Sequence, residues 1–477
     1  MKSIPNHLER YVVEQDYSKY TNEDQAVWRF IMRQLFAFLK IHAHPSYAEG
    51  LKQTGISINK IPEIAKMDQK LSDFGWRAVP VSGFIPPAAF MSFQAHRILP
   101  IASEMRSLKN ILYTPAPDII HEAAGHAPIL IDEAFTNYLT AYSEVAKNAI
   151  ISSEDMALYE AIRDLSDIKE KPGATSAEIE AASKHLEKVS SSLTYVSEAQ
   201  LLGRMNWWTA EYGLIGSLDD PKIFGAGLLS SIGEARNCLK GPKHLEFTID
   251  CLDYNYDITE QQPQLFVAKD FNSLTNALDQ MSEQMAFRLG GEKALKKAHQ
   301  AATVCTVCLS DDSTYSGVLT SYEIENEKIK NLSFKSPCLI KSTELKHEDS
   351  SFDLADSDLT VTSVYGGPSS FENYPQFEDF VAKRITKNPI DNIKTEDLLG
   401  KIRNFRKKKL EKNTAQNLKN LKSEYYDHSA DHWLAGLELL EMDTNDSELK
   451  IHLEKIKDSS EDKDVQTCIE LGLCLVH

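Results

Sequence analysis

The sequence predicts a mainly α protein in three parts: a large helical domain over residues 1–298, a small β-rich module over 299–375 and a helical region over 376–477. Three observations support this order. Apolar residues recur at helical spacing through most of the first part. Short clusters of Thr, Val, Ile, Leu and Tyr, interrupted by Asp, Ser, Asn, Gly and Pro, are typical of strands in the second. The third part is rich in Lys, Glu and Leu, as helices are.

The composition narrows the classes of partner. Lys and Arg total 52 against 70 Asp and Glu, for a net charge of −18, so we expect no binding to nucleic acid or to an anionic membrane. No apolar run is long enough to span a bilayer, and residues 1–10 lack the basic segment and apolar block of a secretory signal. Seven scattered cysteines, an odd number, are typical of reduced thiols. We therefore expect a cytoplasmic protein.

The first predicted core helix begins near Thr21. The sequence Thr-Asn-Glu-Asp at this point is typical of a capping box, and apolar residues follow at helical spacing as far as Phe38. We interpret His42 and His44, near the end of this helix, as structural residues rather than metal ligands. Prolines and glycines then crowd residues 75–87, which predicts an extended, turn-rich loop of the kind that often lines a site.

Two polar helices are predicted within residues 152–195, after a helix over 134–151. Ser152 and Thr175 each begin a capping sequence, on either side of a turn at residues 171–173. Because these helices are polar, we expect them to lie at the periphery of the domain.

Several motifs in the second and third parts are interpreted as structural. Cys305-Thr-Val-Cys308 has no second CxxC pair, so we expect ordinary strand positions rather than a redox or zinc site. The basic run at residues 403–412 predicts a solvated helical face. His428 and His432 have i,i+4 spacing, but no third ligand is evident, so a second metal site is not favoured.

The strongest functional signal is a short helical segment with two histidines and an acid between prolines. His121, Glu122 and His126 lie within residues 113–128, and imidazole is a ligand for zinc, copper, iron and nickel. A zinc peptidase has His-Glu-x-x-His, which places both rings on one helical face. Here the second histidine comes five residues after the first, roughly 140° away at about 100° per residue. The spacing predicts two adjacent corners of a larger coordination sphere, with a third ligand from elsewhere.

A second segment carries a carboxylate beside an aromatic ring. Ser197 begins a further helix that runs to Gly213 and contains Trp207 and Glu211. Because these two residues are four positions apart, an α-helix would place them on one face.

Three motifs in this order resemble those of the pterin-dependent aromatic amino acid hydroxylases: residues 113–128, 207–214 and 224–234. The similarity covers about residues 10–295. It implies that residues 1–298 have the catalytic fold of this family. It also implies Fe(II) and a tetrahydropterin, such as tetrahydrobiopterin, as cofactors, O2 as co-substrate and a free aromatic amino acid as substrate. The implied reaction couples oxidation of the pterin to hydroxylation of the aromatic ring.

The resemblance also implies roles for individual residues. His121, His126 and Glu211 match the facial triad that holds iron and leaves three coordination positions open. Arg106 is the expected fork for the substrate carboxylate, supported by Asp118. The full implied substrate subsite consists of Arg106, Thr114, Pro117, Asp118, Trp207, Tyr212 and Ser230, of which Ser230 also orients a ligand histidine. The implied pterin subsite consists of Gly83, Phe84, Ile85, Phe90 and Glu122, with the pterin stacked on Phe90.

Within the family, Trp207 and Ile258 favour phenylalanine as the substrate, with tryptophan or tyrosine as the alternative. Two positions depart from the family pattern: Asn206 stands where many relatives have a tyrosine, and Pro87 stands where serine is frequent. The interval between the second histidine and the glutamate is also longer than in the animal enzymes, and residues 152–195 account for the extra length.

Two other classes stay open at this point. A zinc-dependent metallohydrolase would also use histidines and a glutamate, but the five-residue spacing counts against it. A metal-stabilised binding or regulatory protein would instead carry its function in the C-terminal part.

Overall fold

The computed structural model describes most of the chain: residues 4–83, 85–112, 117–170, 174–256, 261–325, 328–340, 344–346, 348–354, 358–363, 366, 425, 433–442, 446–460 and 462–475. Several predicted features lie outside these residues, namely Phe84, Thr114, the turn at 171–173, Ile258, the basic run at 403–412, His428 and His432. None of the helices within the described ranges is long and apolar enough to cross a membrane.

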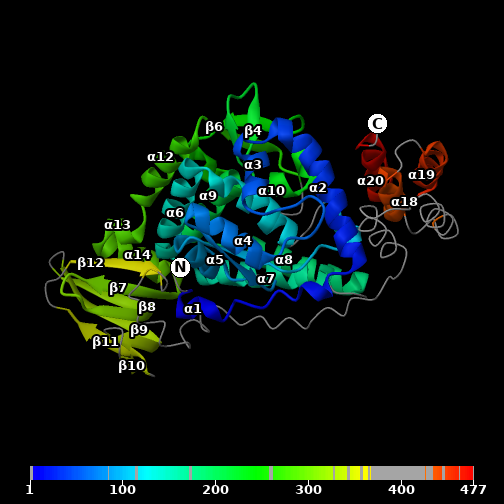
Figure 1. Ribbon diagram of the computed structural model, residues 1–477. Helices are drawn as coiled ribbons and strands as arrows, with labels where there is room; N and C mark the ends of the chain where they lie inside the picture. The colour runs from blue at the N-terminus through cyan, green and yellow to red at the C-terminus, as the bar shows by residue number, and fades with distance from the viewer. Residues whose placement is uncertain are drawn as a thin grey trace.

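The prediction of a mainly α protein is confirmed. The first part contains α1 (Asn6–Glu9), α2 (Asn22–His42), α3 (Ser46–Gln53), α4 (Ile64–Leu71), α5 (Pro87–Ala95), α6 (Glu133–Asn148), α7 (Ser153–Glu170), α8 (Ser176–Ser191), α9 (Glu198–Asn206), α10 (Ala226–Ser230), α11 (Ile232–Asn237), α12 (Phe271–Ser282), α13 (Ala286–Leu289) and α14 (Gly291–Ala301). Shorter helical turns connect some of them (Figure 1).

The predicted capping box of α2 is present. Thr21 accepts a hydrogen bond from the backbone N–H of Asp24, whose carboxylate accepts one from the backbone N–H of Thr21. This reciprocal pair satisfies two N–H groups that the first turn of a helix leaves without partners. Beyond α2, His44 Nδ1 lies 2.7 Å from Ser46 Oγ. Neither His42 nor His44 belongs to a metal-binding cluster in the described part of the chain.

Two small sheets accompany these helices. Strands β1 (Arg77–Val81) and β2 (Ile98–Ala102) pair in parallel, with Arg77 opposite Ile98. A four-stranded sheet has the order β4-β3-β6-β5 and consists of β3 (Leu214–Gly216), β4 (Pro221–Ile223), β5 (Lys243–Glu246) and β6 (Gln264–Ala268).

The predicted β unit is an antiparallel sheet that begins after α14. Its strands are β7 (Val304–Leu309), β8 (Thr314–Glu325), β9 (Lys328–Ile340), β10 (Glu344–Lys346), β11 (Ser350–Asp353) and β12 (Leu359–Ser363). The order is β10-β9-β8-β7-β12, and β11 also pairs with β9. Cys305 and Cys308 lie in β7 with free thiols, as ordinary strand positions. Apolar residues of α14 share the core of this sheet.

The described C-terminal residues include three helices on the side of the body away from the sheet (Figure 1), and the first and third of them contact α2. They are α18 (Trp433–Met442), α19 (Ser447–Ser459) and α20 (Lys463–Leu475). Arg29 of α2 forms a buried ion pair with Glu438 of α18, with Nε–Oε1 at 2.6 Å and Nη2–Oε2 at 2.9 Å. The rings of Phe30 and Trp433 meet edge to face beside it, 5.9 Å apart. Packing and charge therefore both join these helices to the body.

Both polar helices predicted within residues 152–195 form, and both predicted caps are present. The hydroxyls of Ser152 and Thr175 accept hydrogen bonds from the backbone N–H groups three residues later. The peripheral position is confirmed for α8, which has no buried residue. It is wrong for α7, where Ala161 and Leu165 are buried, because one apolar stripe of this mostly polar helix packs against the body.

Candidate active site

The two histidines lie in a π-helical segment, Ile120–His126. A π-helix repeats its hydrogen bonds from residue i to residue i+5, so residues five apart return to nearly the same face. The expected angle of roughly 140° between His121 and His126 is therefore wrong, because it assumed α-helical geometry. The two rings lie 5.0 Å apart between centroids and are nearly perpendicular. The spacing that does not fit a zinc peptidase suits a π-helix.

This segment is held close to α10. A Cβ atom at Gly125 would lie 2.7 Å from the carbonyl oxygen of Ala226, so only glycine permits this approach. At the other end, the Asp118 carboxylate accepts a hydrogen bond from the backbone N–H of His121 at 3.0 Å. The histidine segment is therefore fixed by one side-chain cap and one close backbone contact.

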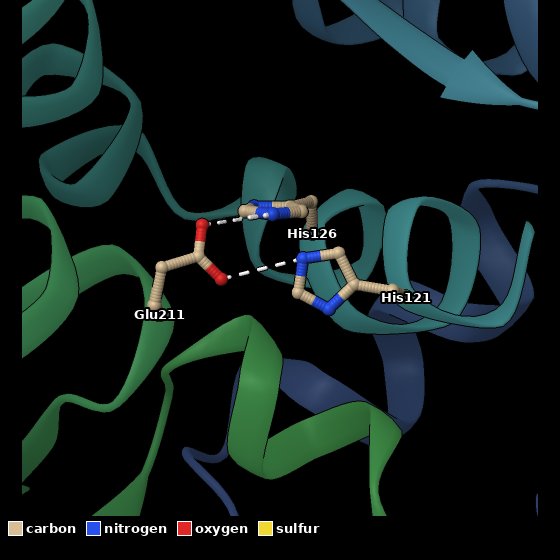
Figure 2. Close-up of side chains that lie close together, drawn as sticks. All are labelled: His121, His126 and Glu211. Atoms are coloured by element: carbon tan, nitrogen blue, oxygen red, sulfur yellow. Dashed lines mark ion pairs between the residues drawn. The ribbon is translucent and has the colours of Figure 1, made fainter. Parts of the chain in front are cut away.

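Glu211 reaches the same point from a second π-helical segment, Trp207–Glu211, which continues α9. Its i to i+5 pattern is seen in the bond from Tyr212 N–H to the Trp207 carbonyl at 2.8 Å. The two carboxylate oxygens lie 3.3 Å from Nε2 of His121 and 3.4 Å from Nε2 of His126. Figure 2 shows the three side chains converging on one point. His121, His126 and Glu211 form the one potential metal-binding cluster found among the described residues.

These three side chains fit a metal ion. Their ligand atoms all lie within 4.8 Å of one another. Nε2 of His126 is buried, and its 3.4 Å contact with Oε1 of Glu211 lacks the geometry of a hydrogen bond, as expected for two atoms that share a cation. Burial raises the pKa of the Glu211 carboxyl, but the two imidazoles outweigh burial and lower it. The carboxylate is therefore ionised, and its charge suits a cation.

Ser230 determines which nitrogen of His121 can bind a metal. Its hydroxyl donates to the carbonyl of Ala226 at 2.7 Å and lies 3.1 Å from Nδ1 of His121. Because its single proton is donated to Ala226, Ser230 accepts from Nδ1–H. In the neutral imidazole, Nε2 then carries no proton and is free to bind a metal. This is the orienting role that the resemblance implies for Ser230.

The triad opens into a cavity of about 380 Å³. Its lining joins elements from distant parts of the chain: Val81, Gly83, Ile85, Pro87, Phe90, Met91, Pro100, Ala102, Arg106, Pro117, His121, Glu122, His126, Tyr159, Ile162, Asn206, Trp207, Glu211, Tyr212, Gly227, Ser230, Ser231 and Tyr256. Most of these side chains are apolar or aromatic, and a few polar groups converge among them, as is typical of small-molecule sites.

Arg106 lines the cavity, and Asp118 supports it from behind. The carboxylate of Asp118 accepts from Nε and Nη2 of Arg106, both at 2.8 Å, and from its backbone N–H at 3.1 Å. Burial raises the pKa of Asp118, but the guanidinium outweighs it and the net shift is downward. Nη1 lies 3.3 Å from the Ser230 carbonyl. Asp118 therefore occupies the edge of the guanidinium formed by Nε and Nη2. A ligand carboxylate can bind to the other edge, formed by Nη1 and Nη2.

Trp207, Pro117 and Tyr212 all line the cavity, as predicted. The flat faces of the Trp207 ring, however, are covered by other rings. The indole stacks between Tyr212, at 4.4 Å, and Tyr256, at 4.3 Å. No sequence motif predicts the position of Tyr256, which belongs to none of the three. The stack holds the Trp207 ring in place and presents its edge to the cavity.

Of the predicted pterin residues, Gly83, Ile85, Phe90 and Glu122 line the cavity. The Phe90 ring lies 6.4 Å from the His126 ring. The backbone N–H of Gly83 donates to the carboxylate of Glu104 at 3.1 Å, so this N–H is not available to a ligand and Gly83 can offer its carbonyl. Burial raises the pKa of Glu122 to about 8, although His126 opposes the shift.

Asn206, which departs from the family pattern, lies beside the triad. Its Nδ2 is 3.4 Å from Oε1 of Glu211, because five residues separate the two in a segment that ends with π-helical turns. The resemblance implied a position near the iron for Asn206, and its place on the cavity wall agrees. The cavity-lining positions of Met91, Pro100, Ala102, Tyr159, Ile162 and Ser231 were not predicted.

Comparison with known proteins agrees with this geometry. The family model of the biopterin-dependent aromatic amino acid hydroxylases matches residues 10–155 and 183–313. The chain belongs to this family. It is therefore a pterin-dependent hydroxylase of an aromatic amino acid, and the two matched ranges contain His121, His126 and Glu211.

Individual hydroxylases of the family are similar over more than half of this chain. Phenylalanine-4-hydroxylase from Mesorhizobium japonicum is 28% identical over 60% of this chain and 90% of its own length. The enzyme of the same name from Chromobacterium violaceum is 27% identical over 56% of this chain and 76% of its own. A crystal structure of the latter with bound Fe(III) covers 60% of this chain and 89% of its own, with a TM-score of 0.45 and 24% identity.

Proposed function

We propose that this hydroxylase is an Fe(II)- and tetrahydropterin-dependent monooxygenase that converts free phenylalanine to tyrosine. One observation carries the proposal: His121, His126 and Glu211 line a cavity that also has aromatic walls and a buried guanidinium. The similar proteins named phenylalanine-4-hydroxylase support the choice of substrate.

His121, His126 and Glu211 would hold the iron. Two imidazole nitrogens and a carboxylate oxygen are ligands that suit non-haem Fe(II), and three ligands on one side leave the other positions open. Bound iron and pterin together would supply the activation of O2, with the pterin as the source of two electrons. Ser230 holds the proton of the neutral His121 ring on Nδ1, so that Nε2 would be available to hold the iron.

Arg106 would bind the carboxylate of the amino acid through Nη1 and Nη2. Asp118 holds the guanidinium in a fixed plane by two hydrogen bonds of 2.8 Å, so little side-chain freedom remains to be lost on binding. The edge of Trp207 and the rings stacked on it would position the substrate ring. The guanidinium, the triad and the aromatic wall line one cavity, which suits an amino acid with an aromatic side chain.

Phe90, Gly83, Ile85 and Glu122 would bind the pterin on another wall of the same cavity. Phe90 offers a ring face, and Glu122 offers a carboxyl whose Oε2 is buried, accepts no hydrogen bond within the described residues and lies 3.9 Å from Nε2 of His126. A buried carboxyl of this kind can bind the polar edge of a heterocycle.

We further propose that the reaction takes place in the cytoplasm and involves no nucleic acid. All seven cysteines are free thiols, and five of them are buried, which suits a reducing compartment. The net charge of −18 disfavours nucleic acid as a partner.

Product identification tests the proposed function. The purified chain is loaded anaerobically with Fe(II) and tetrahydrobiopterin, mixed with phenylalanine, tyrosine or tryptophan, and then exposed to O2. We expect tyrosine from phenylalanine only when iron, pterin and O2 are all present. Hydroxylation of tryptophan or tyrosine alone would change the assigned substrate. Activity with Zn(II) and without O2 or pterin would instead identify a metallohydrolase.

A further inference from the structure

Helix α7 gives the cavity a wall from outside the two ranges that match the family. Those ranges end at residue 155 and resume at 183, whereas α7 spans Ser153–Glu170. Tyr159 and Ile162 of α7 nevertheless line the same cavity as the triad. The inserted segment therefore belongs to the active site.

This wall is held in place at both ends of α7. In the first turn, the Glu154 carboxylate accepts hydrogen bonds from the backbone N–H groups of Thr194 at 2.7 Å and Tyr195 at 3.0 Å. In the last turn, Lys109 Nζ donates to the carbonyl of Lys169 at 3.0 Å. With Ala161 and Leu165 buried between these ends, the side chains that α7 presents to the cavity have a fixed position.

The hydroxyl of Tyr159 is the polar group that α7 brings to the cavity. The hydroxyl oxygen is buried, and its proton has no acceptor within hydrogen-bonding distance among the described residues. Arg163 interacts with the oxygen, but a guanidinium can only donate. Burial raises the pKa of this phenol, and Arg163, one turn further along α7, opposes the shift only in part. The hydroxyl therefore keeps its proton and can both donate and accept. A buried O–H donor without an acceptor is costly, which indicates that a ligand supplies the acceptor.

Tyr159 lines the same cavity as Val81 of β1 and the residues that follow this strand, Gly83, Ile85 and Pro87. These residues form the β1 end of the cavity, where the proposed function places the pterin beside Gly83 and Ile85. The side chains at this end are apolar, and Pro87 also lacks a backbone N–H. A pterin bound here needs hydrogen bonds for its polar atoms, and these side chains supply none.

We propose that Tyr159 is a pterin-binding residue, whose hydroxyl forms a hydrogen bond with the bound pterin. The inserted helix α7 thereby contributes to the choice of pterin in this enzyme. This inference rests on the proposed function, because it places the pterin at the β1 end of the cavity.

Direct binding measurements test the inference without turnover. The probes are 7,8-dihydrobiopterin, which carries a hydroxylated side chain, and 6-methyl-7,8-dihydropterin, which does not. Each is titrated by calorimetry into the wild-type protein, Tyr159→Phe and the control Tyr195→Phe. The control removes a phenol outside the unmatched segment, where Tyr195 packs against the core of the β sheet. Thermal melting verifies that each variant folds, and phenylalanine is titrated in parallel.

We expect Tyr159→Phe to weaken pterin binding about three- to tenfold, the contribution of one neutral hydrogen bond, and Tyr195→Phe to leave it unchanged. A loss with both probes assigns the bond to the pterin ring, and a loss with 7,8-dihydrobiopterin alone assigns it to the side chain; both results support the inference. Unchanged pterin affinity, or weaker binding of phenylalanine alone, would overturn it. If the wild-type protein binds neither pterin, the proposed function itself fails, which is a distinguishable result.

Discussion

Ser230 and His121 form a hydrogen bond whose direction is set by a third group. Ser230 Oγ lies 2.7 Å from the Ala226 carbonyl and 3.1 Å from His121 Nδ1, so the serine donates to the carbonyl and accepts from the imidazole. The bond determines the tautomer of His121 and directs Nε2 to Glu211, 3.3 Å away. The serine thus belongs to the metal centre although it does not touch the metal position.

The first prediction concerns this bond. Ser230→Ala leaves Nδ1 without its acceptor and allows the proton to move to Nε2, so we expect Fe(II) affinity to fall about 10- to 100-fold. Equilibrium dialysis against Fe(II) under anaerobic conditions measures the change. Ser143→Ala is the matched control, because the Ser143 hydroxyl also donates to a carbonyl four residues earlier in a helix but does not line the cavity. Equal iron affinity in the wild type and Ser230→Ala would contradict the assigned role.

The second prediction concerns the substrate fork. In Arg106→Lys, one ammonium group replaces a guanidinium that binds Asp118 on one edge and offers the other to the ligand. We expect the affinity for phenylalanine to fall by about 1.5–3 kcal/mol, roughly 10- to 100-fold, while pterin affinity is retained. Calorimetric titration of both ligands gives the comparison. A parallel loss of pterin binding would mean that the substitution disturbs the whole cavity.

The third prediction is a pH dependence of stability that arises at Glu234. Burial raises the pKa of this carboxyl from 4.5 to about 7. Between these pH values the folded chain holds a proton that the unfolded chain releases, so the free energy of unfolding falls as pH rises. The contribution is about 3 kcal/mol at most.

Glu234→Gln should remove this contribution, because a glutamine side chain does not titrate. Urea unfolding of the wild type and Glu234→Gln at pH 5 and pH 7 measures it. We expect the variant to gain stability relative to the wild type as pH rises. A difference between the two proteins that is the same at both pH values would show that Glu234 has its ordinary pKa.

The fourth prediction concerns the contact between the C-terminal helices and α2. Glu438→Gln leaves the buried Arg29 guanidinium without its counter-charge, which we expect to cost about 3–5 kcal/mol. Hydrogen exchange in peptides from α18 and α20 should become faster. The double variant Arg29→Met/Glu438→Leu should restore slow exchange, since it removes both charges. As a control, Glu180→Gln breaks an exposed pair with Lys184 on α8 and should change stability by less than about 1 kcal/mol.

The features that depend on near neighbours in the chain were predictable. Thr21, Ser152, Thr175 and Ser197 each accept a hydrogen bond from the backbone N–H three residues later, so their sequence pattern contains the whole motif. The alternation of short apolar strands with turn residues likewise indicated the β sheet.

The candidate metal cluster was predicted in composition but not in geometry. His121, His126 and Glu211 come together as the resemblance implied, yet the angle expected from an α-helix was wrong. A π-helical turn inserts residues without a distinctive sequence pattern, and it persists here because Gly125 packs against α10 and Asp118 caps the segment. These contacts join residues that are far apart in the sequence.

The sequence by itself determined the order of the parts, the helix caps, the family and the identity of the candidate ligands, because these depend on residue type and short spacing. Tertiary structure alone decided that Tyr256 covers Trp207, that Glu104 occupies the Gly83 N–H and that Tyr159 of α7 reaches the cavity. Each of these contacts depends on how distant segments pack against one another. Which side chains touch depends on how the folded segments are placed in space. A local sequence pattern does not specify which distant residue a side chain will contact.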